Sequence, residues 1–309
     1  MPRSVKLDAH LTGSAFRVGE SDFHGLEGHR LRLRTLDRPH RGVRSLGLDL
    51  STVRGRCRAY LPLLGSKVFS HTTAALLHGI PLPLELELEP AAGEADAHLH
   101  VSSIGGTRPR GDGIVGHELV TASVVLVEEL PVVSAAETWC QLAATVDREH
   151  LVAAGDFLLS GTRLSAGRRT RPLCTRAELE DSVRRHGRRP GAPALRWALP
   201  RLRTGVDSVP ETLLRLAIAA GGLAEPVIGH AIAVADGSVV HPDLAYPDAR
   251  IVIEYEGDRH RTDKQRFRRD IRRYRRMEDA GWRVIRVAGT EPADLEAAVA
   301  SVRAALTGR

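Results

Sequence analysis

The sequence predicts an α/β (α+β) protein with a mixed sheet flanked by helices in its C-terminal third. Two patterns lead to this class. Segments with helical apolar spacing alternate with strand-like segments from about residue 50 to 165, and after residue 205 the predicted order is α-β-β-β-α-β-α. With 309 residues, of which 42% are hydrophobic and 27% charged, the chain is long enough for two ordinary globular domains.

Residues 1–48 are expected to form a winged-helix-like segment. Within it, residues 15–45 contain a short helical segment, a glycine-marked turn, a basic helical segment and the strand sequence GVR. This is the element order of a small winged helix-turn-helix, in which the second helix approaches DNA. A small helical subdomain without DNA contacts has the same pattern, so the sequence leaves both interpretations open.

Residues 49–165 are predicted to form an α/β domain with its own core, because helical segments such as SHTTAALLHGI alternate with strand-like ones such as ASVVLVEELPVV. His98 and His100 have the spacing of one strand face and could bind a metal ion together. Because no third or fourth ligand is evident near them in the sequence, solvent-facing histidines are the favoured interpretation. For His71 and His78, which flank a helix rich in alanine and leucine, packing or capping is expected.

Residues 166–205 are expected to be a basic linker. They are rich in arginine, proline and glycine, and they contain one short helical piece at 176–186. Two roles stay open for this segment. It could contact phosphate, or it could be a solvated connector.

The positive charge of the protein is concentrated in one part of the chain. The net charge is +6, and residues 250–289 hold 13 Arg and Lys against 7 Asp and Glu, an excess of 13 − 7 = 6 that leaves the remainder neutral. A localised basic surface attracts polyphosphate backbones, so nucleic acid is the expected partner.

The composition also argues against several classes of protein. No apolar run has the length of a signal peptide or a membrane span, so we expect a cytoplasmic protein without a membrane partner. The three cysteines, Cys57, Cys140 and Cys174, lie far apart and outside CxxC spacing. Neither a zinc knuckle nor a disulfide framework is therefore expected.

Residues 206–309 are predicted to form the C-terminal domain. Ser208 is the expected N-cap of its first helix, and Glu211, three residues later, completes a capping box. Three strands separated by turns follow, and then a helix at about 263–280, the strand WRVIRV and a last helix.

The register of the second and third of these strands brings acidic residues together. A tight turn between the strands pairs Asp243 with Glu254 and His241 with Glu256. Directly paired side chains share a face with β-carbons roughly 4.5 to 5.5 Å apart, where like charges are destabilising without a cation. Mg²⁺ takes oxygen ligands, typically one or two carboxylates. The alternative is a set of surface carboxylates matched by surface arginines.

The helix at 263–280 is predicted to carry a structural ion pair and a basic surface. Asp270 falls within the apolar stripe of the helix, so it should face the core and need a partner there. Arg273, one turn along, or an arginine from the sheet would clamp it. Eight basic residues between Lys264 and Arg276 form a candidate surface for phosphate, or else a solvated face. The expected phosphate contacts are Arg266, Arg268, Arg269, Arg272 and Arg276.

This C-terminal region resembles a known family. The run HPDLAYPDARIVIEYEGDRH, followed by RRDIRRYRRMEDAGWRVIRV, is similar to the small endonuclease-like family related to the very-short-patch-repair (Vsr) nucleases, within the PD-(D/E)xK superfamily. The shared pattern is a PD dipeptide, a strand with an acidic end, a nearby His, D-x-x-R and a G-W-x-V-x-R strand. The resemblance covers about residues 205–290 and implies a restriction-endonuclease-like sheet. Residues 15–165 are similar to AbiEi antitoxin-like proteins, which are often fused to such a nuclease domain.

The nuclease resemblance implies roles for individual residues. Asp243 and Glu254 would bind Mg²⁺ or Mn²⁺, and Glu211 would be an auxiliary acid, although its capping role explains it equally well. The superfamily lysine should stand at position 256, where this chain has Glu256. His260 is implied as the substitute base or phosphate contact.

The resulting expectation is a Mg²⁺-dependent DNA endonuclease that cuts or nicks DNA in repair or defence. The alternative is a non-catalytic DNA-binding regulator of the antitoxin type, which keeps the nuclease fold as a binding platform. An interaction module with unused carboxylates ranks third. The sequence leaves open the target site, the choice between DNA and RNA, and the oligomeric state, for which a homodimer is one arrangement.

Overall fold

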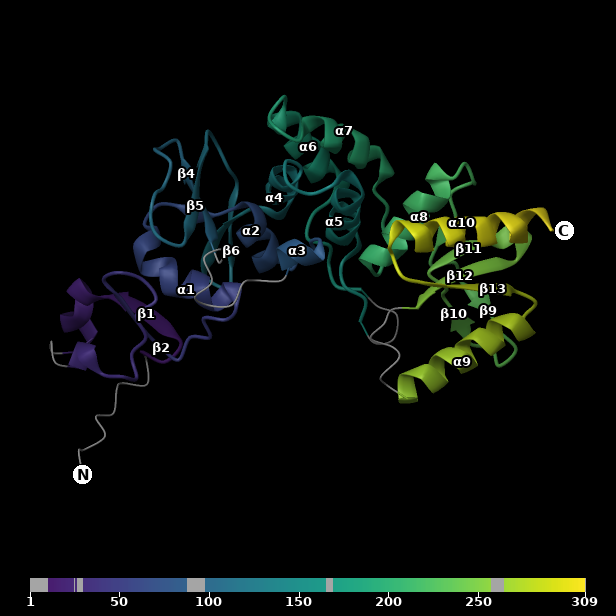
Figure 1. Ribbon diagram of the computed structural model, residues 1–309, viewed down its shortest axis with the longest axis horizontal. Coiled ribbons are helices and arrows are strands. Elements are labelled where there is room, and N and C mark those ends of the chain that lie inside the picture. Colours follow the sequence, from purple (N-terminus) through teal and green to yellow (C-terminus); the bar gives the residue numbers. More distant parts are fainter. Residues whose placement is uncertain are drawn as a thin grey trace. The chain divides into compact units, whose positions relative to one another are not determined.

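The computed structural model describes residues 11–24, 26, 30–87, 98–164, 169–256 and 264–308, and it is a mixed α/β structure of the α+β class, as predicted (Figure 1). The chain forms two compact units. The first contains residues 1–146 and 181–192, and the second contains residues 147–180 and 193–309. Within the described ranges, no helix combines the length and the apolar character that crossing a membrane requires.

The N-terminal part of the first unit is a two-stranded sheet with short helical turns. Strand β1 (Ser14–Arg17) pairs antiparallel with β2 (Val43–Leu46), which confirms the predicted GVR strand. The helical segments expected before it are the 3-10 helices η2 (Val18–His24) and η3 (Arg30–Arg32). The described residues up to 48 thus contain no α-helix of a helix-turn-helix. Closely spaced glycines in this segment disfavour a continuous α-helix.

A five-stranded mixed sheet forms the rest of the first unit, in the order β5-β4-β3-β7-β6. Its central strands bury Phe69, Val101 and Val132 in one apolar core. The strands are β3 (Val68–Phe69), β4 (Leu99–Ile104), β5 (Ile114–Leu119), β6 (Val124–Val127) and β7 (Leu130–Val133). The helices are α1 (Val53–Leu64), α2 (His71–His78), α3 (Leu84–Glu87) and α4 (Ala135–Leu142).

The expected basic linker is more structured than the sequence suggested. Helix α6 (Arg176–His186) confirms the predicted helical piece, and a second helix, α7 (Ala192–Ala198), is followed by the 3-10 turn η5 (Leu199–Arg201). Helix α5 (Arg148–Ser160), expected in the middle domain, belongs to the second unit and packs there against α8 (Val209–Ala220).

A buried ion pair joins α5 to α8. Arg215 donates to Oδ2 of Asp156 at 2.8 Å, and both side chains are almost completely buried. The hydroxyl of Thr212 and the backbone N–H of Arg203 also donate to this carboxylate. A buried charge is tolerated where hydrogen bonds satisfy it in this way, so this pair ties α5 to α8 within the second unit, called here the C-terminal unit.

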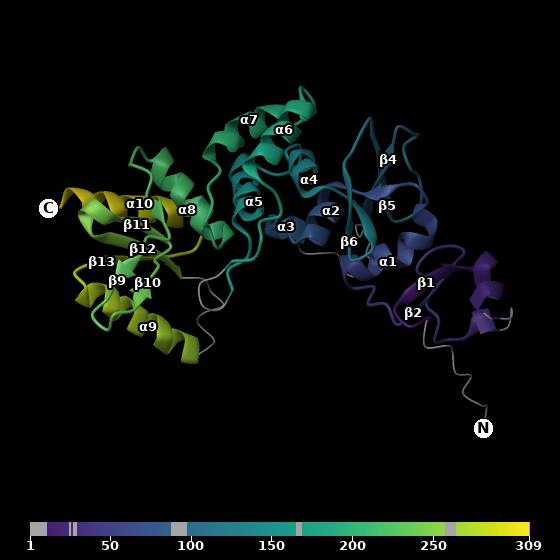
Figure 2. The ribbon, with the colours of Figure 1, turned by 180° about the vertical axis from the view of Figure 1, so that it is seen from behind.

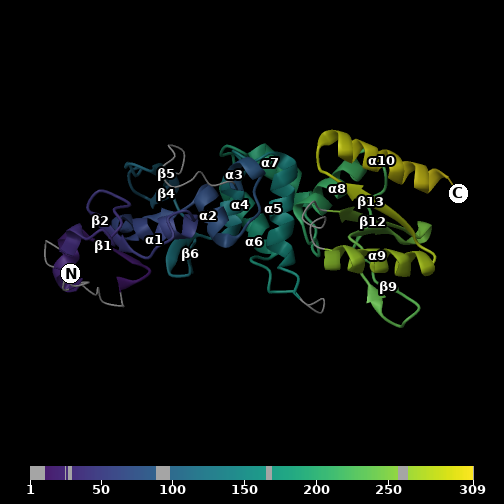
Figure 3. The ribbon, with the colours of Figure 1, turned by 60° about the horizontal axis from the view of Figure 1, so that its bottom comes forward.

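The C-terminal sheet has the strand order β13-β12-β11-β8 and lies between two helical layers (Figure 1, Figure 2 and Figure 3). Residues of α8 and α10 (Pro292–Thr307) pack with one face of β11 (Leu244–Tyr246) and β12 (Ile251–Glu256). Met277 of α9 (Lys264–Asp279) packs with the other face of these strands. Strand β13 (Arg283–Ala288) runs parallel to β12, as a strand returning through a crossover helix does.

The first two C-terminal strands predicted from the sequence are each divided in two. The first consists of β8 (Val227–Ile228) and β9 (Ile232–Ala233), and the second consists of β10 (Val239–Val240) and β11. Strands β9 and β10 pair as a separate hairpin. Pro242 lies at the second interruption, where the absence of a backbone N–H prevents a continuous ladder.

Candidate functional site

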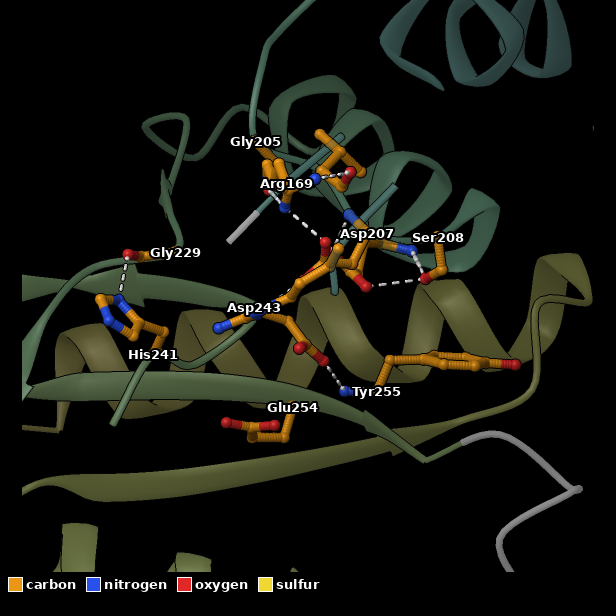
Figure 4. Close-up of polar contacts among 12 residues, drawn as sticks. Arg169, Gly205, Asp207, Ser208, Gly229, His241, Asp243, Glu254 and Tyr255 are labelled. Atoms are coloured by element: carbon orange, nitrogen blue, oxygen red, sulfur yellow. Dashed lines mark hydrogen bonds and ion pairs between the residues drawn. The ribbon is translucent and has the colours of Figure 1, made fainter. Parts of the chain in front are cut away.

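The strand register predicted from the sequence is confirmed, and it places Asp243 opposite Glu254. In the β11–β12 ladder, Leu244 pairs with Ile253 and Tyr246 with Ile251. Continuing this ladder by one residue matches Asp243 with Glu254. The backbone N–H of Tyr255 donates to Oδ2 of Asp243 at 2.8 Å, and Figure 4 shows the two acidic side chains on adjoining strands.

Glu254 is a buried carboxyl group without a full set of partners. The residue is 2% exposed, and its Oε1 atom has no hydrogen-bond partner. Desolvation, reinforced by the nearby charge of Asp243, raises the pKa of Glu254 to about 8. Burial also raises the pKa of Asp243. At neutral pH the pair therefore resists carrying two negative charges unless a cation joins it.

Glu211 is both a helix cap and a third acidic group of the site. Ser208 Oγ accepts from the Glu211 N–H, which confirms Ser208 as the N-cap. The Glu211 side chain reaches back as in the predicted capping box, but its Oε2 accepts from the N–H of Asp207, one residue before the N-cap, at 3.0 Å. The Glu211 side chain is buried, and desolvation together with the charge of Asp243 raises its pKa to about 7. One residue thus connects the start of α8 electrostatically to the acidic pair.

Arg273 of α9 pairs with Glu254. Its Nη1 donates to Glu254 Oε2 at 2.5 Å, and its Nη2 donates to the carbonyl oxygen of His241. The sequence predicted that Arg273, or an arginine from the sheet, clamps Asp270. The contact of Arg273 with Glu254 was not predicted, and it supplies a positive charge to a buried carboxylate. The side chain of Asp270 lies outside the described structure, so the clamp stays a prediction.

A second group of ions, which the sequence did not predict, lies beside the acidic pair. Asp207 accepts from Arg163 at 2.7 Å and from Arg169, and its charge contributes to the raised pKa values of Asp243 and Glu211. Figure 4 shows Arg169 and Asp207 next to Asp243. Arg169 comes from the expected linker, where a cluster of basic residues hinted at such a role, whereas Arg163 comes from the end of the segment predicted as the α/β domain.

The other predicted catalytic residues are less central. Glu256 is half-buried, and its Oε1 lies 3.4 Å from Nη1 of Arg286 on β13. The described β11–β12 ladder starts at Leu244, so it does not include the expected pairing of His241 with Glu256. The His241 ring forms a hydrogen bond with the Gly229 carbonyl instead. His260 lies outside the described residues.

The predicted phosphate contacts on α9 are only partly described. Arg272 is exposed on the helix, whereas Arg276 donates to Asp236 and Ser238 of the β9–β10 hairpin. The side chains of Arg266, Arg268 and Arg269 lie outside the described structure, although their backbone is helical.

The sequence did not predict a group of three histidines in the first unit. Ligand nitrogens of His71, His100 and His117 all lie within 4.8 Å of one another. Among the described residues, this is the one group of three His, Cys, Asp or Glu residues close enough to hold a metal ion. His98 is exposed as expected, but His100 is half-buried. Burial lowers the pKa of His71 to about 3 and that of His100 to about 4, with a contribution from His117. Their distant sequence positions gave no signal for this grouping.

A basic cavity of about 870 Å³ lies in the first unit. Arginines from the N-terminal sheet, α1 and the loop before β5 contribute to its wall, with Asp112 as the one acidic residue among those that line it. The basic lining residues are Arg38, Arg41, Arg44, Arg56, Lys67 and Arg110. Six cations against one carboxylate make this a site suited to anions.

Comparison with known proteins finds similar proteins in two strains of Mycobacterium tuberculosis. "Uncharacterized protein MT2308" of Mycobacterium tuberculosis strain CDC 1551 and "Uncharacterized protein Rv2248" of strain H37Rv are each 27% identical to this chain over 173 residues. The match covers 56% of this chain and 60% of each relative, so the chain spans less than two thirds of their length. No protein family matches the chain, and no solved structure matches it.

Proposed function

We propose that the C-terminal unit is a Mg²⁺- or Mn²⁺-dependent DNA endonuclease. The observation that carries this proposal is the pair of Asp243 and Glu254, matched across the β11–β12 ladder, with the buried Oε1 of Glu254 lacking a partner. The proposal includes a DNA substrate and a cytoplasmic role in repair or defence.

The residues present fit a hard divalent ion. Asp243 and Glu254 would hold it through carboxylate oxygens, the donors that Mg²⁺ and Mn²⁺ prefer, and two carboxylates are a usual protein contribution. The ion would polarise the phosphate and lower the pKa of an attacking water. Its charge would also compensate the pair, whose ionised state is otherwise disfavoured by burial.

The chain's own side chains would orient the site and move protons. Arg273 holds one oxygen of Glu254, so the remaining oxygen points to a defined place. Glu211, with a pKa of about 7, is suited to exchange a proton at neutral pH. Because position 256 holds a glutamate in place of the superfamily lysine, the role of base falls to Glu211 or to His260.

Nicking of supercoiled plasmid in Mg²⁺ or Mn²⁺ tests the proposal. The wild-type protein should convert supercoiled DNA to open circles, and Asp243→Asn and Glu254→Gln should reduce this rate by a factor of about 100 or more, since each removes a carboxylate of the ion site. Glu278→Gln, which changes an exposed acid on α9, is the matched control and should keep the wild-type rate. A wild-type protein that fails to nick with either ion contradicts the enzyme.

A DNA-binding regulator without catalysis is the second candidate, and two observations favour it. Arg273 already supplies a positive charge to Glu254, as a cation would in an active site. The basic cavity of the first unit offers a separate surface for phosphate. In this case the protein should bind DNA without nicking it, and Asp243→Asn should bind as the wild type does.

The salt dependence of DNA affinity identifies which surface of the protein binds DNA. The slope of log affinity against log salt should fall by about 0.9 for each of Arg41→Ala and Arg110→Ala if each contacts one phosphate. Arg184→Ala, which removes an exposed arginine paired with Asp181, is the control and should leave the slope unchanged. Equal slopes for all three variants would exclude the basic cavity as the DNA surface.

A further inference from the structure

Three histidines of the first unit converge from separate elements. His71 is the first residue of α2, His100 lies in β4 and His117 in the neighbouring strand β5. The two strands are parallel, with Ser102 opposite His117, so His100 and His117 are diagonal neighbours on adjoining strands. Nδ1 of His100 and Nε2 of His117 are 2.9 Å apart.

The rings are stacked closely. Those of His71 and His117 have centroids 3.7 Å apart and planes 18° apart, and those of His100 and His117 are separated by 5.1 Å. Two protonated imidazoles at these separations would repel each other, so the arrangement favours neutral rings. A neutral imidazole has a nitrogen lone pair, which is the form in which histidine binds metal ions.

Neighbouring polar groups hold His71 in position. Its backbone adopts a φ of 52°, uncommon for a residue other than glycine, and its N–H donates to Oε1 of Gln141 at 2.8 Å. Its ring Nδ1 lies 3.0 Å from Ser70 Oγ, which accepts in turn from the hydroxyl of Ser102 at 2.6 Å. In the tautomer in which Nδ1–H donates to Ser70 Oγ, Nε2 keeps its lone pair for a ligand, as in metal sites where an outer partner orients the ring.

We propose that His71, His100 and His117 form a binding site for a divalent transition metal ion of the zinc class. In a tetrahedral site with bonds of 2.0 to 2.1 Å, ligand nitrogens are roughly 3.4 Å apart. This separation lies between the 2.9 Å of the closest pair and the 4.8 Å within which all three ligand atoms lie, so the spacing of the nitrogens is compatible with one ion. Because imidazole lone pairs lie in the ring planes, binding requires the stacked rings to turn until these lone pairs converge on the ion.

The donor set selects the ion and leaves a position open. Imidazole nitrogens suit Zn²⁺, Co²⁺, Ni²⁺ and Cu²⁺, whereas Mg²⁺ takes oxygen, so this site and the carboxylates of the C-terminal unit differ in metal preference. Three protein ligands with a vacant fourth position are typical of zinc ions that bind water or a substrate. The competing explanation is a metal-free stack in which a proton joins His100 to His117.

Metal titration of the full-length protein without a histidine tag tests the site. The wild type, stripped with a chelator, should bind one equivalent of Co²⁺ with the visible absorption of tetrahedral cobalt, and Zn²⁺ should displace it. His117→Gln and His100→Gln should weaken binding by more than the roughly 10–100-fold that losing an outer partner costs. His98→Gln is the matched control, because His98 is exposed on the chain next to β4, and it should bind like the wild type.

Two further measurements separate loss of the site from loss of folding. Ser70→Ala keeps all three ligands and removes the hydroxyl that contacts Nδ1 of His71, so it should weaken binding by about 10–100-fold while the fold persists. Zn²⁺ should raise the Tm of the wild type and of His98→Gln, but not that of His117→Gln. A wild type that binds no Co²⁺ or Zn²⁺ at micromolar concentration, or equal binding by His117→Gln and His98→Gln, overturns the proposal and identifies a metal-free stack. Neither result depends on nuclease activity.

Discussion

Replacing Glu254 by glutamine should make the metal-free protein more stable at alkaline pH. Burial and Asp243 raise the pKa of Glu254 from 4.5 to about 8. Between these two values the folded chain keeps a proton that the unfolded chain has released, so the free energy of unfolding falls as pH rises. Glutamine can still accept from Arg273, and it has no proton to lose.

The magnitude follows from the same shift. A difference of one bound proton corresponds to about 1.4 kcal/mol per pH unit, so the wild type should lose about 2 kcal/mol relative to Glu254→Gln between pH 6 and pH 7.5. Below pH 4.5 Glu254 is protonated in both the folded and the unfolded wild type. The free energy of unfolding should then have the same pH dependence in the wild type and in Glu254→Gln. Mg²⁺ should reverse the trend in the wild type alone if it binds the ionised pair.

Urea unfolding in a chelator at pH 6 and pH 7.5 measures this difference. Because the chain has two units, the readout should be local, for example hydrogen-exchange protection of peptides from β11 and β12. Glu256→Gln, two residues along the same strand with a side chain that is 39% exposed, is the control and should follow the wild type. Parallel pH curves for the wild type and Glu254→Gln would refute the assignment of a strongly desolvated carboxyl group.

Three further predictions concern other parts of the chain. Asp156→Ala leaves Arg215 buried without its main partner, so urea unfolding should show a loss of about 3 to 5 kcal/mol, and a loss under about 1 kcal/mol would contradict this. Ser208→Ala breaks the capping box and should cost the C-terminal unit about 1 kcal/mol in the same assay, whereas an unchanged midpoint would show that water replaces the cap. Gly55→Ala in α1 would ordinarily favour a helix by about 1 kcal/mol, but its Cβ would lie 1.7 Å from the Asp49 carbonyl oxygen. The Tm should therefore fall, and a rise would mean that this contact relaxes without cost.

Local patterns in the sequence determined the helical cap and the strand register of the candidate site. The capping box of Ser208 and Glu211 depends on four consecutive residues. The pairing of Asp243 with Glu254 depends on a short turn, because a turn of given length fixes which residues face each other. Neither pattern needs information from distant parts of the chain. The enzymatic role built on these residues stays a proposal.

Other contacts were not predicted from the sequence because they join distant residues. Arg273 was expected to serve the helix, whereas its long side chain reaches Glu254 on the sheet, a desolvated carboxyl group that needs a positive charge. Helix α5 was assigned to the middle domain by its position, yet Asp156 binds Arg215 across the second unit. Burial of charge, which a sequence pattern does not contain, decides both.

The sequence by itself thus determined the α+β class, the acidic pair and the first turn of α8, since these follow from periodicity, turn length and capping over a few residues. Only the tertiary structure brought Arg273 to Glu254, Asp207 to Arg163, and His71 to His117. The physical reason is that these contacts join residues 19 to 46 positions apart, whose approach depends on how whole sheets and helices pack.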